Sequence, residues 1–203
     1  MNIESILKDI PDKRDNKNTT SLVMKKDLIN FFGDNYLNKK CFEIGTNRGY
    51  TTRVLSFLFE TVKTIELDNQ LINFAKDLNK DRKNINYVQG DVYKTVIKSD
   101  NWWDNDNNSL VEKYDVFFID CVHDAVHVAL DIKKALDEGT DDVILVFDDY
   151  GLPENTPSVK VAVEQAVMNG FLKVVKYIGE PAGEEPRRGR KLVDWEGVIC
   201  QRA

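Results

Sequence analysis

The chain has 203 residues, of which 42% are hydrophobic and 31% are charged, and its formal net charge is −6. The length fits one α/β domain with a sizeable core, and the composition is ordinary for a globular protein. The acidic balance offers no basic surface for a phosphate backbone, so we expect a small-molecule partner and no nucleic acid.

The cysteines and the apolar segments indicate where such a chain resides. Cys41, Cys121 and Cys200 are odd in number, widely separated and without a C-x-x-C pair. This pattern predicts reduced thiols in the cytoplasm rather than a disulfide framework or a zinc site. No apolar run reaches membrane-spanning length and the N-terminus lacks a secretory signal, so we expect no membrane partner.

The first part of the chain divides into an arm and the start of a domain. Residues 1–20 end in a polar run, and we expect a flexible arm there after a short helical turn. Residues 21–203 are expected to form a single domain. Thr20 or Ser21 can cap a helix that extends to Phe32, and Gly33 would end it.

The stretch from Cys41 to Thr52 combines a short strand, a glycine turn and the start of a helix. Gly45 ends the strand where the backbone needs a positive φ or a close approach to a ligand. Gly49 stands just before a helix whose apolar residues recur at helical spacing. The N-terminus of such a helix offers unpaired N–H donors, so the stretch predicts a loop that binds an anion or a polar ligand.

The glycine spacing narrows the choice of ligand. A dinucleotide fold needs G-x-G-x-x-G, whereas Thr46 stands at the middle position here, and no Gly-Lys-Ser/Thr follows as in a P-loop. The pattern acid-x-Gly-x-x-x-Gly instead resembles motif I of the class I S-adenosylmethionine-dependent methyltransferases, whose loop wraps the methionine end of the cofactor. The resemblance implies a cofactor loop made of Glu43, Gly45, Thr46, Asn47, Arg48 and Gly49. The alternative is a turn whose glycines serve only packing.

The second predicted strand, T-V-K-T-I-E-L-D, brings an acid to the same edge. Glu66 follows the glycine loop by roughly 20 residues, where an acid can accept hydrogen bonds from two ribose hydroxyls. Asp68 competes for this role, but Asp-Asn-Gln at a helix start is more simply an N-cap. We therefore predict that Glu66 binds the ribose and that Asp68 is structural.

The third predicted strand, I-N-Y-V-Q-G-D-V, ends at Asp91. In the methyltransferases that this chain resembles, the acid at this place lies beside the adenine. Asp91 can equally cap the helix that begins at Val92. The loop that follows carries Trp102 and Trp103, which either line a pocket or, as we prefer, anchor the loop.

Two buried strands then deliver three aspartates to one edge of the predicted sheet. Asp120 follows a continuous apolar run, and Asp148 and Asp149 follow a second one. Three carboxylates at adjacent strand ends repel one another unless a cation joins them, and their hard oxygen atoms suit Mg²⁺, with Mn²⁺ or Ca²⁺ as substitutes. The alternative is that each acid only caps a strand end or holds a turn.

This trio of acids resembles the divalent-metal site of the catechol and caffeoyl-CoA O-methyltransferases and of the macrolide-sugar O-methyltransferases. The residue three beyond the first aspartate is a lysine base in the catechol group and a histidine in some macrolide-sugar enzymes, and here it is His123. The resemblance implies that Asp120 and His123 are catalytic and that Asp120 also contacts the cofactor. The chain is short for the macrolide-sugar enzymes. His127 is interpreted as a packing residue because no third zinc ligand is evident.

The C-terminal part completes the expected fold. A helix from about Ser158 to Met168 precedes two β-rich stretches, which suit the antiparallel seventh strand typical of these methyltransferases. The loop between the stretches carries Arg187, Arg188, Arg190 and Lys191, and is either solvated or faces an anionic acceptor. The fold that the resemblance implies is α/β and Rossmann-like, with a seven-stranded mostly parallel sheet, helices on both faces and an antiparallel last strand.

The function expected from these patterns is Mg²⁺-assisted, S-adenosylmethionine-dependent O-methyl transfer to a small hydroxylated acceptor such as a sugar or a vicinal diol. Three alternatives stay open: a metal-independent methyltransferase, a non-catalytic module that binds S-adenosylmethionine, and a nicotinamide dehydrogenase. Related enzymes often dimerise, so a homodimer is the oligomer that the resemblance implies.

Overall fold

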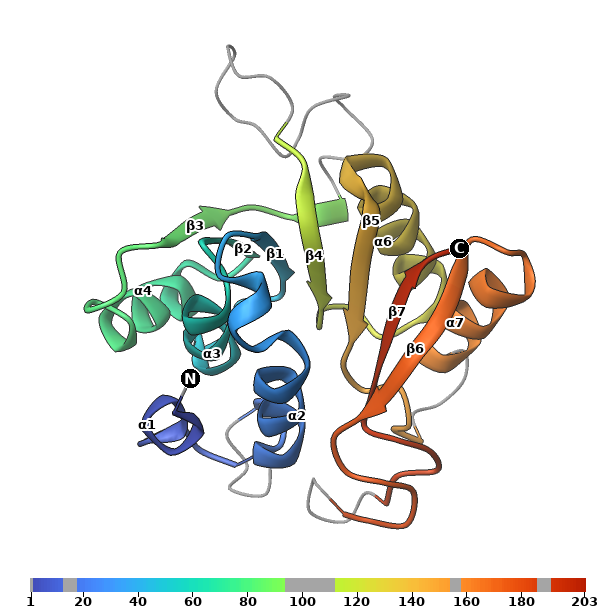
Figure 1. The fold of residues 1–203 in the computed structure, drawn as a ribbon, viewed down its shortest axis with the longest axis horizontal. Helices are drawn as coiled ribbons and strands as arrows, with labels where there is room; N and C mark the ends of the chain where they lie inside the picture. The colour runs from blue at the N-terminus through green and yellow to red at the C-terminus, as the bar shows by residue number, and fades with distance from the viewer. Residues whose placement is uncertain (1, 13–17, 94–111, 154–157, 186–190) are drawn as a thin grey trace.

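The structure is a computed structural model that describes residues 2–12, 18–93, 112–153, 158–185 and 191–203. In this part of the chain, seven strands form one sheet in the order β3-β2-β1-β4-β5-β7-β6 (Figure 1). The strands are β1 (Lys40–Ile44), β2 (Thr61–Glu66), β3 (Ile85–Gln89), β4 (Tyr114–Ile119), β5 (Gly139–Phe147), β6 (Leu172–Ile178) and β7 (Gly197–Arg202).

The directions of the strands match the expectation from sequence. Strands β3, β2, β1, β4 and β5 pair in parallel, whereas β7 pairs antiparallel with both β5 and β6. The helices are α1 (Ile3–Leu7), α2 (Leu22–Phe32), α3 (Tyr50–Leu58), α4 (Asn69–Leu78), α6 (Ala125–Glu138) and α7 (Val159–Met168), with a short 3₁₀ helix η2 (Gly33–Tyr36) after α2. The predicted Rossmann-like sheet with an antiparallel last strand is confirmed.

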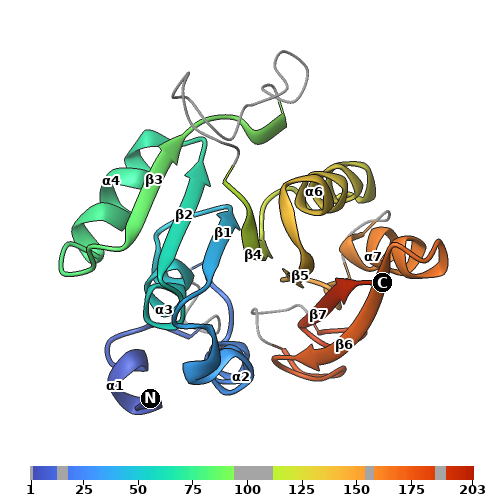
Figure 2. The same cartoon turned by 45° about the horizontal axis from the view of Figure 1, so that its top comes forward.

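The two faces of the sheet each carry a hydrophobic core, and helices cover both faces (Figure 2). Side chains alternate along β4, so that Val116 and Phe118 pack toward α2 and α3 while Phe117 and Ile119 pack toward α6 and α7. This two-sided burial explains the continuous apolar runs in the sequence of the central strands. It leaves the strand ends as the places where polar side chains emerge.

The N-terminal segment contains the short helix α1, whose Ile6 is buried in the core beneath α2 and α3. The mobility of residues 1–20 stays a prediction. Ser21, one of the two expected caps, accepts the Met24 N–H at 3.0 Å and caps α2. The helix ends at Gly33, whose φ is +50°, as the sequence predicts.

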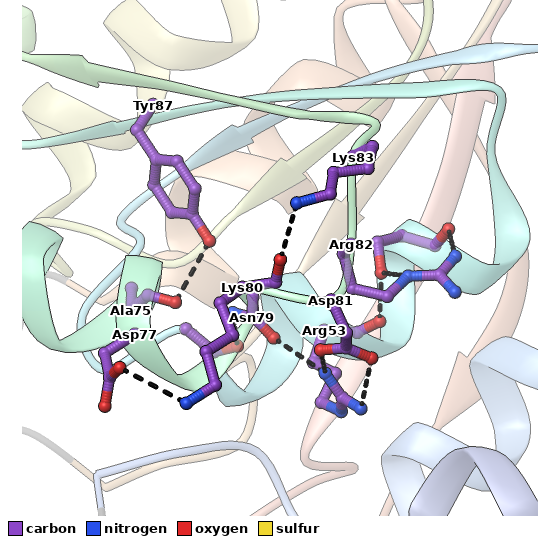
Figure 3. Close-up of polar contacts among 11 residues, drawn as sticks. Arg53, Ala75, Asp77, Asn79, Lys80, Asp81, Arg82, Lys83 and Tyr87 are labelled. Carbon is purple, nitrogen blue, oxygen red and sulfur yellow. Dashed lines mark hydrogen bonds and ion pairs between the residues drawn. The ribbon is translucent and has the colours of Figure 1, made fainter.

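A polar cluster ties the far end of α4 to α3 (Figure 3). Arg53 pairs with Asp81 at 2.8 Å, and the Tyr87 hydroxyl donates to the Ala75 carbonyl at 3.1 Å. The Asn79 amide donates to the Gly49 carbonyl at 3.0 Å. Because Gly49 immediately precedes α3, this cluster helps to fix the point where the glycine loop enters the helix.

Two properties of the whole chain complete the description. Among the described residues, no helix combines the length and the apolar character needed to cross a membrane. The three cysteines are free, with Cys41 and Cys200 buried and Cys121 half-buried.

Candidate functional site

The glycine loop, residues 45–49, connects β1 to α3 at the carboxyl edge of the sheet. Three of its five residues have positive φ: Gly45 at +97°, Asn47 at +47° and Gly49 at +75°. A Cβ atom at Gly45 would lie 1.9 Å from the carbonyl oxygen of Asp120, so only glycine fits between β1 and β4. Asn47 is the single non-glycine residue of the loop in the left-handed region, a conformation that costs energy and needs support from its surroundings.

Hydrogen bonds hold this loop against β2. The N–H groups of Gly45 and Thr46 both donate to the Ile65 carbonyl, at 3.1 and 3.2 Å. The Asn47 N–H donates to Glu66 Oε2 at 2.9 Å, and the Asp68 N–H donates to Glu66 Oε1 at 3.0 Å. Glu66 is thus oriented through both of its oxygens, and each oxygen can still accept a further hydrogen bond.

Asp68 behaves as the sequence predicts. Its side chain accepts the Gln70 N–H at 2.7 Å and caps α4. It therefore has a structural role at the helix start. The assignment of Glu66 rather than Asp68 to the ribose stays a prediction, which the orientation of the Glu66 carboxylate supports.

A cavity of about 250 Å³ opens beside the glycine loop. Its walls include three predicted cofactor residues, Gly45, Glu66 and Asp91. They also include Tyr93 and Cys121, which the sequence did not mark as site residues and whose only signal was their place two residues after Asp91 and directly after Asp120. Asp91 accepts the Tyr93 N–H at 3.0 Å, the bond expected of a cap, and its role beside the adenine stays a prediction.

A larger groove lies elsewhere, between α6 and α7. Its volume is about 680 Å³, and its lining is mostly small or apolar, with Ala125, Ala129 and Ala162 among its residues. None of the predicted site residues lines it. The smaller cavity at the glycine loop is therefore the one that coincides with the sequence motifs.

Glu43 is fully buried behind the loop rather than in the wall of the cavity. Its Oε2 accepts hydrogen bonds from the hydroxyls of Thr52 and Thr64, both at 2.6 Å. Burial raises the pKa of Glu43 to about 8, although the two hydroxyl hydrogen bonds act in the opposite direction, while the charges of Asp120 and Glu66 raise it further. Contact of Glu43 with a cofactor stays a prediction.

Two other predicted loop residues turn away from the cavity. The Thr46 hydroxyl is buried and lies 2.5 Å from the Thr64 hydroxyl. The Arg48 guanidinium lies 6.0 Å from the centre of the Phe74 ring on α4. These side chains support the loop in this structure, and their contact with a cofactor stays a prediction.

Asp120, His123 and Asp149 converge at the ends of β4 and β5. Their ligand atoms all lie within 4.8 Å of one another. His123 Nε2 is 3.3 Å from Asp120 Oδ1 and 3.5 Å from Asp149 Oδ2. Asp149 has a φ of +56°, so its backbone turns out of the strand direction. The adjacent Asp148 is buried and does not join this group of converging ligand atoms.

The acids control the protonation of His123. Burial alone lowers its pKa, but the hydrogen bond to Asp120 and the charges of Asp149, Asp120 and Asp148 outweigh burial and raise the pKa to about 9. At neutral pH His123 is therefore an imidazolium ion held between carboxylates. It can take a proton only when those negative charges are compensated by another positive charge.

The remaining sequence predictions fall into two groups. The centre of the His127 ring lies 4.4 Å from the centre of the Tyr93 ring, and His127 Nδ1 forms a hydrogen bond with Asp124 Oδ2 at 2.6 Å. These contacts confirm a packing role. The tryptophan pair at 102–103 and the arginines at 187–190 lie outside the described residues.

The combination of fold and site defines a class of protein. A strand, a glycine loop and a helix, with an acid at the end of the second strand and an antiparallel last strand, form the class I fold of S-adenosylmethionine-dependent methyltransferases. Residues 42–150, more than half of the chain, match the profile of a family described as a methyltransferase domain. The chain belongs to this family and is an S-adenosylmethionine-dependent methyltransferase. No curated protein matches the chain.

Solved structures share the fold at low sequence identity. The O-methyltransferase from Bacillus cereus, in complex with SAH, aligns with a TM-score of 0.64 at 15% identity, over 99% of this chain and 90% of that chain. Cofactor-bound Rv0187 from MTB aligns with a TM-score of 0.63 at 16% identity, over 98% of this chain and 85% of that chain.

An N-methyltransferase is similar to the same degree. NodS from Bradyrhizobium japonicum, in complex with S-adenosyl-L-homocysteine, aligns with a TM-score of 0.63 at 13% identity, over 88% of this chain and 85% of that chain. At these identities the likeness extends to the fold alone. Enzymes that methylate oxygen and nitrogen are equally near, so the atom that this chain methylates has to be argued from its own site.

Glu43→Gln should change how stability depends on pH. Because the pKa of Glu43 is raised from 4.5 to about 8 on folding, the folded state binds more protons than the unfolded state between these values. The free energy of unfolding of the natural protein therefore falls as pH rises through this window, by up to about 1.4 kcal/mol per pH unit from this group. Glu43→Gln should flatten that slope.

Chemical denaturation at pH 5, 7 and 9 measures the effect. Glu60→Gln, at an exposed position after α3, is the matched control and should keep the slope of the natural protein. Parallel pH profiles for the natural protein and Glu43→Gln would contradict the raised pKa.

Proposed function

We propose that this methyltransferase transfers a methyl group to a hydroxyl of a small molecule with the help of a divalent cation. The observation that carries the proposal is the convergence of Asp120, His123 and Asp149, whose ligand atoms lie within 4.8 Å of one another. They lie at the same edge of the sheet as the glycine loop that follows β1. A histidine between two carboxylates next to a cofactor cavity suits deprotonation of an alcohol better than methylation of an uncharged amine nitrogen.

We place the cofactor in the cavity at the glycine loop. Glu66 accepts the ribose hydroxyls with the lone pairs that Asn47 and Asp68 leave available. Asp91 lies along the same cavity and takes the adenine side. When bound, S-adenosylmethionine supplies an activated methyl group on a positively charged sulfur, and the surrounding acids favour that charge. The two SAH-bound structures with the same fold support this choice of cofactor.

Asp120 and Asp149 are the residues that would hold the cation. Their carboxylate oxygens are the hard ligands that Mg²⁺ takes, with Mn²⁺ or Ca²⁺ as substitutes. Asp148 is the third metal ligand that we predict from the sequence. A cation bound there would lower the pKa of an acceptor hydroxyl. It would also compensate the charges that raise the pKa of His123, so that the imidazole becomes neutral and able to accept the hydroxyl proton.

We infer the class of acceptor and the cellular setting from the charge and composition of the chain. With a net charge of −6, the protein suits a small neutral acceptor such as a sugar or a vicinal diol rather than nucleic acid. Its three free thiols suit the cytoplasm. A homodimer is the assembly that we infer from the related enzymes.

Titration with S-adenosylhomocysteine by calorimetry tests the cofactor site. We expect micromolar binding by the natural protein and at least roughly tenfold weaker binding by Glu66→Ala, since two hydrogen bonds to a charged carboxylate are lost. Asp68→Asn keeps a helix cap at the neighbouring position and should bind within about twofold of the natural protein. Absence of binding by the folded natural protein would contradict the placement of the cofactor.

Asp149→Asn tests the cation site. Asn tolerates the left-handed backbone at this position, so the substitution removes the charge with little backbone strain. We expect methyl transfer to fall at least about a hundredfold, while binding of S-adenosylhomocysteine is retained. EDTA should have the same effect on the natural protein. Asp142→Asn, exposed at the other end of β5, is the control and should stay active.

Proton NMR gives an independent measure of cation binding, because the chain has only two histidines and His127→Gln assigns them. Without added metal, the His123 ring should titrate near pH 9, and Mg²⁺ or Asp149→Asn should lower that midpoint. A midpoint unchanged by Mg²⁺, together with turnover that resists EDTA, would favour the metal-independent methyltransferase instead.

A further inference from the structure

A row of buried hydroxyl groups runs beneath the glycine loop. Thr64 on β2 lies directly across from Glu43 in the parallel pairing with β1. The Thr64 hydroxyl donates to Glu43 Oε2 at 2.6 Å and lies 2.5 Å from the Thr46 hydroxyl. Thr64 and Glu43 are both 0% exposed and Thr46 is 3% exposed, so water does not compete for these bonds.

The available protons allow two arrangements of this row. When Thr64 donates its single proton to Glu43, Thr46 donates to Thr64; when the protonated Glu43 carboxyl donates instead, Thr64 can donate to Thr46. In either arrangement the two hydroxyls connect the loop to the buried carboxyl. Glu43 Oε1 has no hydrogen-bond partner among the described residues, so its Oε2, with Thr64 and Thr52, carries the polar contacts of this carboxyl.

The loop above this row needs such an anchor. Thr46 lies between Gly45 and Asn47, which both have positive φ, and the Asn47 conformation is unfavourable for a non-glycine residue. On the cavity side, the Asn47 N–H is held by Glu66, the same carboxylate that we assign to the ribose. The hydroxyl row holds the loop through side chains that are buried and do not line the cavity.

We propose that Thr64 is a positioning residue for the cofactor: its hydroxyl joins Thr46 to Glu43 and holds residues 45–49 in the conformation that binds S-adenosylmethionine. The inference rests on the proposed placement of the cofactor at this loop and names a residue of β2 that does not line the cavity itself. Thr64 orders the loop before the cofactor arrives, which reduces the entropy that binding would otherwise lose.

Thr64→Val is the direct test, because valine keeps the shape of threonine and removes only the hydroxyl. Calorimetry with S-adenosylhomocysteine should show binding weakened roughly tenfold, the effect of one buried hydrogen bond. Thr64→Ser, which keeps the hydroxyl, should restore most of the affinity. In turnover, Thr64→Val should raise the cofactor KM and leave kcat at saturation nearly unchanged.

Thr52→Val is the matched control. It removes the other hydroxyl that donates to Glu43 Oε2, but Thr52 lies on α3, and its hydroxyl forms no hydrogen bond with Thr46. Both valine variants should lower the melting temperature of the free protein to a similar extent, while only Thr64→Val weakens binding. Equal losses of affinity in the two variants, or unchanged affinity in Thr64→Val, would overturn the proposal.

A double-mutant cycle tests whether the Thr46 and Thr64 hydroxyls act together. Thr46→Val breaks the same hydroxyl pair from the loop side, so Thr46→Val combined with Thr64→Val should lose no more affinity than the more affected single variant. Additive losses of affinity would show that the two hydroxyls act separately and would overturn the proposal. If the folded natural protein binds no S-adenosylhomocysteine, the proposed cofactor site itself fails, which is a different result from natural affinity in Thr64→Val.

Discussion

The register of four parallel strands brings the residues of the candidate site together. Ile44 of β1 pairs with Ile65 of β2 on one side and with Ile119 of β4 on the other, and Ile119 pairs with Phe147 of β5. The residues that follow in each strand therefore emerge side by side: Gly45, Glu66, Asp120 and Asp148. The contact is so close that a side chain at Gly45 would overlap the Asp120 carbonyl. A shift of one residue in any pairing would separate the glycine loop from the acids.

A second consequence of this register is a concentration of acidic side chains at the carboxyl edge of the sheet, where several of them are buried. Two features of the structure reduce the cost of this arrangement. Glu43, which is fully buried, has a pKa of about 8 and so is largely protonated at neutral pH, because burial disfavours its charge. At the ends of β4 and β5, Asp120 and Asp149 hold His123 as an imidazolium ion. The charges that raise the pKa of His123 give this edge of the sheet a negative potential, which would favour the positive charge of a sulfonium cofactor or a divalent cation.

The fold and the site answer different questions about function. The fold is shared with enzymes whose names give oxygen or nitrogen as the methylated atom, so the family match identifies the reaction class while the fold leaves the acceptor open. The argument for an oxygen acceptor depends instead on three side chains at the ends of β4 and β5. The groove between α6 and α7 is larger than the cavity at the glycine loop but is lined by none of these groups, so cavity size alone would not select the candidate site.

The sequence by itself determined the order of strands and helices, the glycine loop and the acids at the strand ends, because apolar periodicity and turn residues are local signals. Only the tertiary structure decided which way these side chains turn. Asp149 joins Asp120 and His123 because its backbone adopts a positive φ, whereas the equally acidic Asp148 beside it does not join them. Thr46 points inward to Thr64, a residue that no motif marks, because their contact arises from the pairing of β1 with β2. Contacts between strands far apart in sequence depend on register, and local periodicity does not encode register.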